Sequence, residues 1–115
     1  MNDILTQLNR IRGIGGSLLC SPDGLPMASA LRADTDEDDL AANIATLIGH
    51  AYRLTAGMTH SKPVLINING AQGGLLLLAA GSAFLIIITD PHANLALLQL
   101  EVTPFVDAII QRLSL

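Results

Sequence analysis

The sequence predicts an α/β fold of the α+β kind, in which a five-stranded, mainly antiparallel sheet lies between helices. Two observations support this prediction. First, segments of strand length and of helical periodicity follow one another in the order α-β-β-α-β-β-β-α. Second, residues 75–80 and 83–89 are strands that are apolar on both sides, so helices must cover both faces of the sheet. We expect one long helix on one face and the N- and C-terminal helices on the other, within a single domain of residues 1–115.

The chain begins with a predicted short helix and a β-hairpin. Apolar residues at helical spacing predict a helix over residues 1–12, and Gly13 fits its C-terminal stop. Strands are expected over residues 17–20 and 25–31. The segment Ser21-Pro22-Asp23-Gly24 between them is a turn, because proline presets φ, aspartate bonds locally and glycine accepts a positive φ.

Residues 33–39 form an acidic stretch that could indicate either a metal site or the start of a helix. Thr35, with Asp38 three residues later, resembles a capping box, and carboxylates in a first turn favour the helix dipole. A calcium loop needs a set spacing of oxygen ligands and a glycine at the bend, which this stretch lacks. We therefore predict a helix start and no metal site. The carboxylates are Asp34, Asp36, Glu37, Asp38 and Asp39.

The helix predicted over residues 36–59 has three faces, whereas a helix with a single core needs only one apolar face. Small residues allow another helix to approach closely. Helix propensity disfavours Gly49 in a helix interior, so a close helix contact explains this residue better than propensity does. We therefore expect the small face to pair with another helix. The aliphatic face, suited to the sheet, comprises Leu40, Ile44, Leu47, Ile48, Ala51, Leu54, Thr55 and Met58; the small face comprises Ala41, Ala42, Ala45, Gly49, Tyr52 and Ala56; the polar strip comprises Asn43, Thr46, His50, Arg53 and Gly57.

Residues 63–69 form a strand whose composition favours the edge of the sheet. It starts at a proline, and its second half alternates the apolar Ile66 and Ile68 with the polar Asn67 and Asn69. A glycine-rich loop over residues 70–74 follows, and the two apolar strands after it are joined by the turn Gly81-Ser82.

The last helix is predicted to start at Asp90, as the N-cap, with Pro91 in its first turn. Pro104 lies inside this segment and is expected to kink or restart the helix, with Thr103 available as a new cap. The predicted core stripe comprises Leu95, Leu98, Val102, Phe105, Ile109 and Leu113.

The composition excludes several classes of function. The formal net charge is −4, the six basic residues are scattered and only three residues are aromatic, so we expect no nucleic-acid binding. Residues 63–89 carry no charge, but asparagines and glycines divide them into pieces of strand length, so we expect no membrane insertion. Half of the residues are hydrophobic, which suggests burial against a partner. The single Cys20 and the absence of a visible signal peptide fit the cytoplasm.

No motif for catalysis, metal binding or cofactor binding is present. Cys20, His50, His60 and His92 are the only candidate nucleophiles or ligands, and the histidines lack the close spacing of helical metal sites. A Cys20–His92 dyad stays open, because dyads assemble in space rather than in sequence. The early glycines precede a strand, whereas a phosphate-binding loop follows one, so any nucleotide would belong to a partner.

Several landmarks together resemble the Roadblock (dynein light chain) family in its prokaryotic branch, similar to the gliding-motility GTPase regulators. The resemblance covers essentially the whole chain and rests on the order and spacing of the landmarks. They are Gly13 to Leu19, the hairpin Ser21-Pro22-Asp23-Gly24-Leu25-Pro26-Met27-Ala28-Ser29, the long alanine-rich helix, and Asp90-Pro91-His92-Ala93-Asn94-Leu95.

The resemblance implies a profilin/longin-like fold and a homodimer, formed by pairing the long helices and by joining two sheets through the third strand. It also implies a Ras-like small GTPase as partner, with stimulation of GTP hydrolysis less secure because the chain lacks the extension that many gliding-motility regulators carry. The expected dimer interface comprises Ala42, Ala45, Gly49, Tyr52, Ala56, Leu65, Asn67 and Asn69, and the partner-binding candidates are Asn43, Thr46, His50 and Arg53.

Two further readings stay open beside the GTPase regulator. Arg53 could act as a finger that stabilises phosphoryl transfer in trans, or simply be a solvated arginine on a polar strip. The chain could instead be a structural scaffold subunit with no effect on a GTPase. An enzyme or a ligand sensor would require a pocket that converges on Cys20 or on a histidine.

Overall fold

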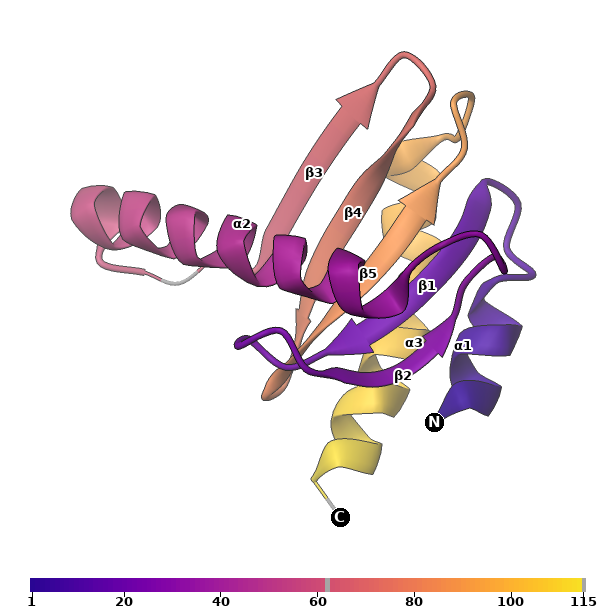
Figure 1. Ribbon diagram of the computed structural model, residues 1–115, viewed down its shortest axis with the longest axis horizontal. Helices are drawn as coiled ribbons and strands as arrows, with labels where there is room; N and C mark the ends of the chain where they lie inside the picture. The colour runs from indigo at the N-terminus through magenta and orange to yellow at the C-terminus, as the bar shows by residue number, and fades with distance from the viewer. Residues whose placement is uncertain (62, 115) are drawn as a thin grey trace.

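The computed structural model describes residues 1–61 and 63–114, and it forms a five-stranded antiparallel sheet with the strand order β2-β1-β5-β4-β3 (Figure 1). This confirms the predicted fold class and the predicted order of elements. The helices are α1 (Asn2–Leu8), α2 (Glu37–Thr59) and α3 (Leu95–Leu113). The strands are β1 (Ile14–Cys20), β2 (Pro26–Ala30), β3 (Leu65–Gly70), β4 (Gly73–Ala80) and β5 (Ala83–Thr89).

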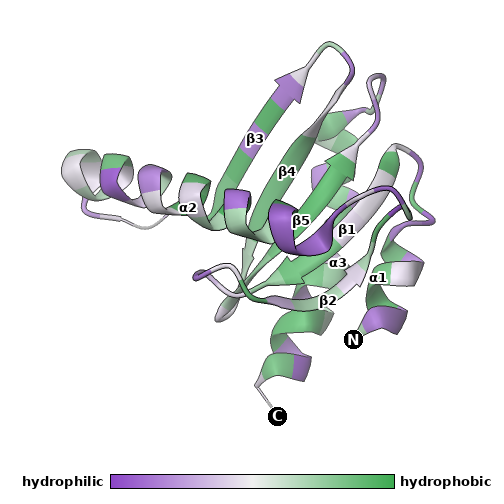
Figure 2. Ribbon diagram, viewed as in Figure 1, coloured by the Kyte–Doolittle hydropathy of each residue, from purple (hydrophilic) through white to green (hydrophobic). Residues whose placement is uncertain are grey.

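Helices cover both faces of the sheet, as the apolar strands β4 and β5 predicted. In Figure 1, α2 crosses one face, while α1 and α3 lie behind the other. Alternate residues of the central strands therefore enter different cores: Leu85 and Ile87 of β5 pack with α1 and α3, whereas Ile86 packs under α2. Figure 2 shows the resulting apolar centre of the sheet and the more polar β3 at its margin.

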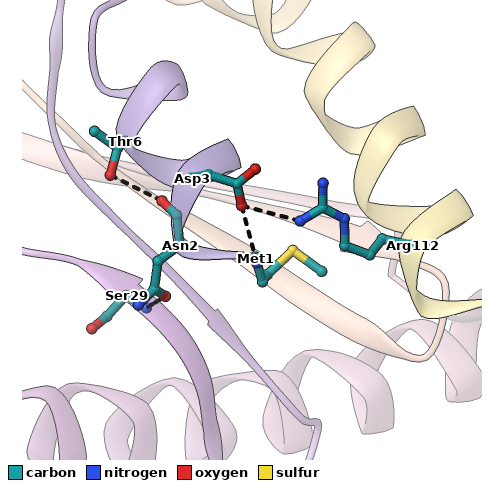
Figure 3. Close-up of polar contacts among 6 residues, drawn as sticks. All are labelled: Met1, Asn2, Asp3, Thr6, Ser29 and Arg112. Atoms are coloured by element: carbon teal, nitrogen blue, oxygen red, sulfur yellow. Dashed lines mark hydrogen bonds and ion pairs between the residues drawn. The ribbon is translucent and has the colours of Figure 1, made fainter.

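Polar contacts at the start of α1 attach this short helix to β2 and to α3 (Figure 3). The backbone N–H of Ser29 in β2 donates to the Asn2 side-chain oxygen at 3.3 Å. Arg112 near the end of α3 donates to the Asp3 carboxylate at 3.0 Å, and the N-terminal amine lies 3.1 Å from the same carboxylate oxygen. These two charges hold the pKa of Asp3 well below its usual range, chiefly through the hydrogen bond from the N-terminal amine and then through that from Arg112.

Two predicted helix starts were wrong. α2 is capped by Asp36 rather than by Thr35, since the Asp36 carboxylate accepts the Asp39 N–H at 3.0 Å. The cap of α3 lies four residues after Asp90: it is Asn94, whose side chain accepts the Leu97 N–H at 3.1 Å, and the helix begins at Leu95. The backbone of Asp90 instead continues the sheet contact by donating to the Gly13 carbonyl at 2.8 Å. In both places two residues of good capping type lie close together, and the sequence alone does not distinguish them.

Of the two effects predicted for Pro104, a kink or a restart of the last helix, the restart was wrong. α3 runs from Leu95 to Leu113 through Pro104, and Thr103 is no cap, because its hydroxyl donates back to the Gln99 carbonyl at 2.9 Å. The predicted core stripe of this helix is confirmed: Leu98, Val102 and Ile109 are buried, and its other three members are partly buried against the same core. At the N-terminus the first helix is shorter than predicted, since it ends at Leu8 rather than at residue 12.

The C-terminal half of α2 extends past the edge of its own sheet. Figure 1 shows α2 starting over β1 and β2 and projecting beyond β3. Ile44 and Ile48 are buried on the sheet, but Leu54 and Met58 of the same predicted aliphatic face are 65% and 79% exposed. Their assignment to the sheet was therefore wrong within a single chain, because the helix is longer than the sheet is wide.

Candidate protein-interaction surface

The edge strand β3 presents a row of unpaired backbone groups to solvent. In an antiparallel ladder, alternate residues bond to the neighbouring strand and the others point away. The Val64 carbonyl accepts from the Ala79 N–H at 3.0 Å, so Ile66 and Ile68 also bond towards β4, while Leu65, Asn67 and Asn69 direct their N–H and C=O groups outward. Within the described part of the chain, no hydrogen bond reaches these outward groups or the two amide side chains. The edge position predicted for this strand is confirmed.

Exposed apolar side chains gather around this edge and the projecting end of α2. Val64, just before β3, is 70% exposed, and Leu65 and Ile68 of β3 are both about two-fifths exposed. Val64, Ile68 and, on α2, Leu54 and Met58 lie on the α2 side of the sheet, and we call these four residues the β3 surface; Leu65 projects from the opposite side of the same strand. Contiguous exposed apolar area of this kind marks sites of protein association. Sequence reasoning missed Val64, although a valine directly after Pro63 before an edge strand offered a signal.

The small face of α2 has two different explanations. Ala41 is fully buried and Ala45 is partly buried, because the β1–β2 turn packs on them: a Cβ added at Gly24 would lie 3.1 Å from the Ala45 Cβ. Gly49 differs, since a Cβ added there would meet nothing within 4 Å. Packing within the chain therefore accounts for the alanines at 41 and 45 and leaves Gly49 without an explanation. The remaining predicted contacts are accessible: Ala42 and Tyr52 are exposed, and Ala56 is partly buried.

The four partner-binding candidates lie together on the exposed side of α2. Asn43, Thr46, His50 and Arg53 are all exposed. Arg53 Nη2 lies 2.8 Å from His50 Nδ1. Because a guanidinium only donates, the imidazole Nδ1 accepts and Nε2 carries the proton in this arrangement. The His50 Nε2–H and the remaining guanidinium N–H groups of Arg53 are therefore hydrogen-bond donors on the same turn of α2.

Two hollows lie away from the β3 edge backbone. A groove of about 390 Å³ runs beneath α2, between Tyr52 on the helix and the β4–β5 turn, and its lining is mainly apolar. A wider cleft of about 530 Å³ lies at the start of α3 and includes His92 and Arg12. The groove is lined by Pro22, Ile48, Tyr52, Pro63, Val64, Ala79, Gly81, Ser82 and Phe84.

The structure does not bring Cys20 and His92 together. Cys20 pairs with Phe84 at one end of the β1–β5 ladder, whereas His92 follows Thr89, which pairs with Ile14 at the other end. Cys20 is buried beneath α2, and burial raises the pKa of its thiol to about 11. Over the described residues, no three His, Cys, Asp or Glu side chains cluster as metal ligands would. No helix in the same residues is long and apolar enough to cross a membrane.

These features define a class of protein: a profilin-like domain with one open sheet edge and a projecting helix, both suited to association with another protein. The family model of the Roadblock/LC7 domain matches residues 1–90. The chain belongs to this family, as its landmarks predicted.

Relatives and solved structures agree with this assignment. The uncharacterized protein MJ0714 of Methanocaldococcus jannaschii is 31% identical over 106 residues, which cover 92% of this chain and 90% of that protein. Myxococcus xanthus MglB superposes with a TM-score of 0.92 at 20% identity, covering 98% of this chain and 94% of MglB. An MglB in a tetrameric arrangement gives a TM-score of 0.84 at 21% identity, covering 95% and 84%. At these identities the two MglB structures show the fold alone.

Proposed function

We propose that this protein is a homodimeric regulator that binds a Ras-like small GTPase and has no active site of its own. The observation that carries the dimer is the mismatch between α2 and the sheet beneath it. Leu54 and Met58 continue the sheet-facing stripe of α2 but are exposed, and Ile68 on the α2 side of β3 is exposed as well. The C-terminal end of α2 projects past β3 (Figure 1).

A second copy, related by a two-fold axis beside β3, would supply what each chain lacks. The projecting end of each α2 would lie over the partner's β3, and the two open edges would join into one continuous sheet. Closure by a two-fold uses the same surface on both chains, so it removes the exposed edge without leaving a new one. Gly49, for which packing within the chain gives no reason, would lie where the two α2 helices meet.

The GTPase part of the proposal rests on the family resemblance together with the polar strip of α2. In such a dimer two copies of Asn43, Thr46, His50 and Arg53 would flank the helix seam and form a composite binding surface. The nucleotide would be bound by the partner GTPase. Whether this protein also stimulates GTP hydrolysis is decided by a turnover assay. A cytoplasmic location is part of the same proposal, and the lone Cys20 fits it.

The dimer can be tested with a matched pair of exposed apolar residues. Met58→Glu would place a charge in the proposed interface, and sedimentation should show a shift from dimer to monomer. Leu100→Glu is the control, because Leu100 is 73% exposed but lies on α3, away from the β3 surface. Equal behaviour of the two variants, or a monomeric wild type, would contradict the proposed dimer.

GTPase binding needs a separate assay with a Ras-like small GTPase. His50→Ala combined with Arg53→Ala should weaken capture of the GTPase while the dimer persists in sedimentation. GTP hydrolysis should then be compared with and without the wild-type protein. Capture that survives the double substitution would remove the polar strip from the proposal. Assembly without any GTPase binding would favour the alternative, a structural scaffold subunit.

A further inference from the structure

We infer that Asn67 lies on the two-fold axis of the dimer and that its side-chain amide selects the register in which two β3 edges join. This inference rests on the proposed homodimer. An open strand edge does not by itself fix how two identical strands align. The inference assigns that choice of alignment to Asn67.

The register follows from which residues of β3 point outward. Leu65, Asn67 and Asn69 direct their backbone groups to the free edge, since the Val64 carbonyl and every second residue after it bond towards β4. In an antiparallel pair of identical strands, centring on Asn67 matches each outward residue with an outward residue of the partner: Asn67 with Asn67, and Leu65 with Asn69. Centring on Ile66 or Ile68 matches only two of the three and leaves the third unpaired.

The side chains favour the same register. Leu65, Asn67 and Asn69 project from the sheet face opposite α2, because Ile66, between them, packs into the core beneath α2. Centring on Asn67 places two amides directly opposite each other. Each primary amide has both a donor and an acceptor, so an asparagine facing its own copy can satisfy itself. Neither Asn67 nor Asn69 spends its side-chain hydrogen bonds on a described residue of its own chain, so both remain available across the edge.

Asn67 also separates this register from strand slippage. A shift of the axis to Ile66 would place Asn67 opposite Leu65 of the partner, so that the amide faces an apolar side chain. A shift to Ile68 would place Asn67 opposite Asn69 of the partner and leave the outward backbone groups of Leu65 without a partner, so the backbone pairing rather than the amide disfavours that register. Asn67 is exposed in the single chain, so the preference comes from the cross-strand pair itself: two facing amides can bond to each other, whereas an amide facing Leu65 cannot. The partner that fits the edge is therefore a second copy of this chain with its own asparagine at the same position.

Disulfide trapping tests the register directly. Residues opposite each other at a hydrogen-bonded position have Cα atoms about 5.5 Å apart, which lies within the range of about 4.4–6.8 Å for disulfides. Asn67→Cys should therefore form a covalent dimer on mild oxidation. Leu65→Cys alone and Asn69→Cys alone should not, since each lies four positions, about 13 Å, from its own copy. A mixture of Leu65→Cys and Asn69→Cys should cross-link. The wild type is the blank, because Cys20 is fully buried.

A charge at the axis supplies the second measurement. Asn67→Asp would place two carboxylates opposite each other and should weaken dimerisation about fivefold near neutral pH. Protonation of the carboxylates at acidic pH should restore the dimer. Asn69→Asp is the matched control, because the residue opposite it would be Leu65 and its effect should be smaller.

The outcomes separate the register from the dimer itself. Cross-linking of Leu65→Cys with Asn67→Cys, or of Asn67→Cys with Asn69→Cys, in place of Asn67→Cys alone would overturn the register. If the protein still sediments as a dimer, the proposed dimer stands. A monomeric wild type would overturn both. Asn67→Cys trapping, the mixed cross-link and the larger effect of Asn67→Asp would together support Asn67 at the axis.

Discussion

The two edges of the sheet are built differently. At β2, Pro26 has no N–H to offer, the Ser29 N–H bonds to Asn2 of α1, and the Ser29 hydroxyl donates to the Glu37 carboxylate at 2.6 Å. The Ala30 carbonyl accepts from the Asn9 amide at 2.7 Å. β3 has no such contacts among the residues the structure describes, although three alternate residues, Leu65, Asn67 and Asn69, direct their backbone N–H and C=O groups outward.

This difference indicates that one edge is closed within the chain and the other is left for association. An open strand edge invites uncontrolled pairing, and proteins usually block it with proline, charge or a covering segment. β2 shows these devices, whereas β3 carries no charged residue and is flanked by exposed apolar side chains. An edge kept open, uncharged and bordered by exposed apolar side chains is consistent with a surface that is covered in the working protein.

The largest expected effect on dimer affinity comes from a substitution at Gly49 of α2, with Gly57 of the same helix for comparison. A Cβ added at either Gly49 or Gly57 meets nothing within 4 Å in the single chain. Replacing a helical glycine by alanine should stabilise an isolated helix by about 1 kcal/mol. Gly57→Ala should therefore raise the stability of the protein. Gly49→Leu should instead weaken the dimer by about 2 kcal/mol, roughly thirtyfold in Kd, because it overfills a close helix contact.

Sedimentation equilibrium of both variants, with thermal unfolding alongside, checks this expectation. Gly49→Ala is the intermediate case, and it should gain helix stability while losing some of the dimer. If Gly49→Leu forms a dimer as tight as that of the wild type, then the small face of α2 is not the seam and the open β3 edge must associate without it.

A smaller effect is expected at the closed edge. Asn2→Ala removes the acceptor of the Ser29 N–H and should cost about 0.5–1.5 kcal/mol in the free energy of unfolding, the usual net worth of a hydrogen bond. Amide hydrogen exchange should show faster exchange at Ser29 than in the wild type, while the dimer stays intact. An unchanged exchange rate at Ser29 would mean that another contact protects the β2 edge.

Much of the fold could be predicted because its signals are local. β5 occupies the residues predicted for it, and the core stripe of α3 follows directly from helical spacing. The start of α3 could not be found in the same way. Asp90 and Asn94 are both good caps, and the choice between them depends on the contact of the Asp90 backbone with Gly13, which is distant in sequence.

The candidate surface could be predicted only in part, for a geometric reason. Periodicity assigned Leu54 and Met58 to the face of α2 that lies on the sheet, but both are exposed. Nothing in the periodicity gives the width of the sheet, so the projection of α2 beyond β3 became visible only in three dimensions. Likewise, Ala41 and Gly49 look alike in sequence, but only Ala41 packs against the β1–β2 turn.

The smallest expected effect tests how α1 is held over the closed edge. The pKa of Asp3 is lowered by the N-terminal amine and by Arg112, so its charged form stabilises the folded state above the unfolded pKa of about 3.9. Asp3→Asn should lower the thermal midpoint slightly at neutral pH. The difference from the wild type should shrink as the pH falls below about 3.9 and also in about 1 M salt, which screens exposed charges. Asp34→Asn is the control, since the one ion pair of Asp34 among the described residues is with Arg32, two residues away, at 3.7 Å. A pH-independent loss in Asp3→Asn would mean that the carboxylate acts through packing rather than through its charge.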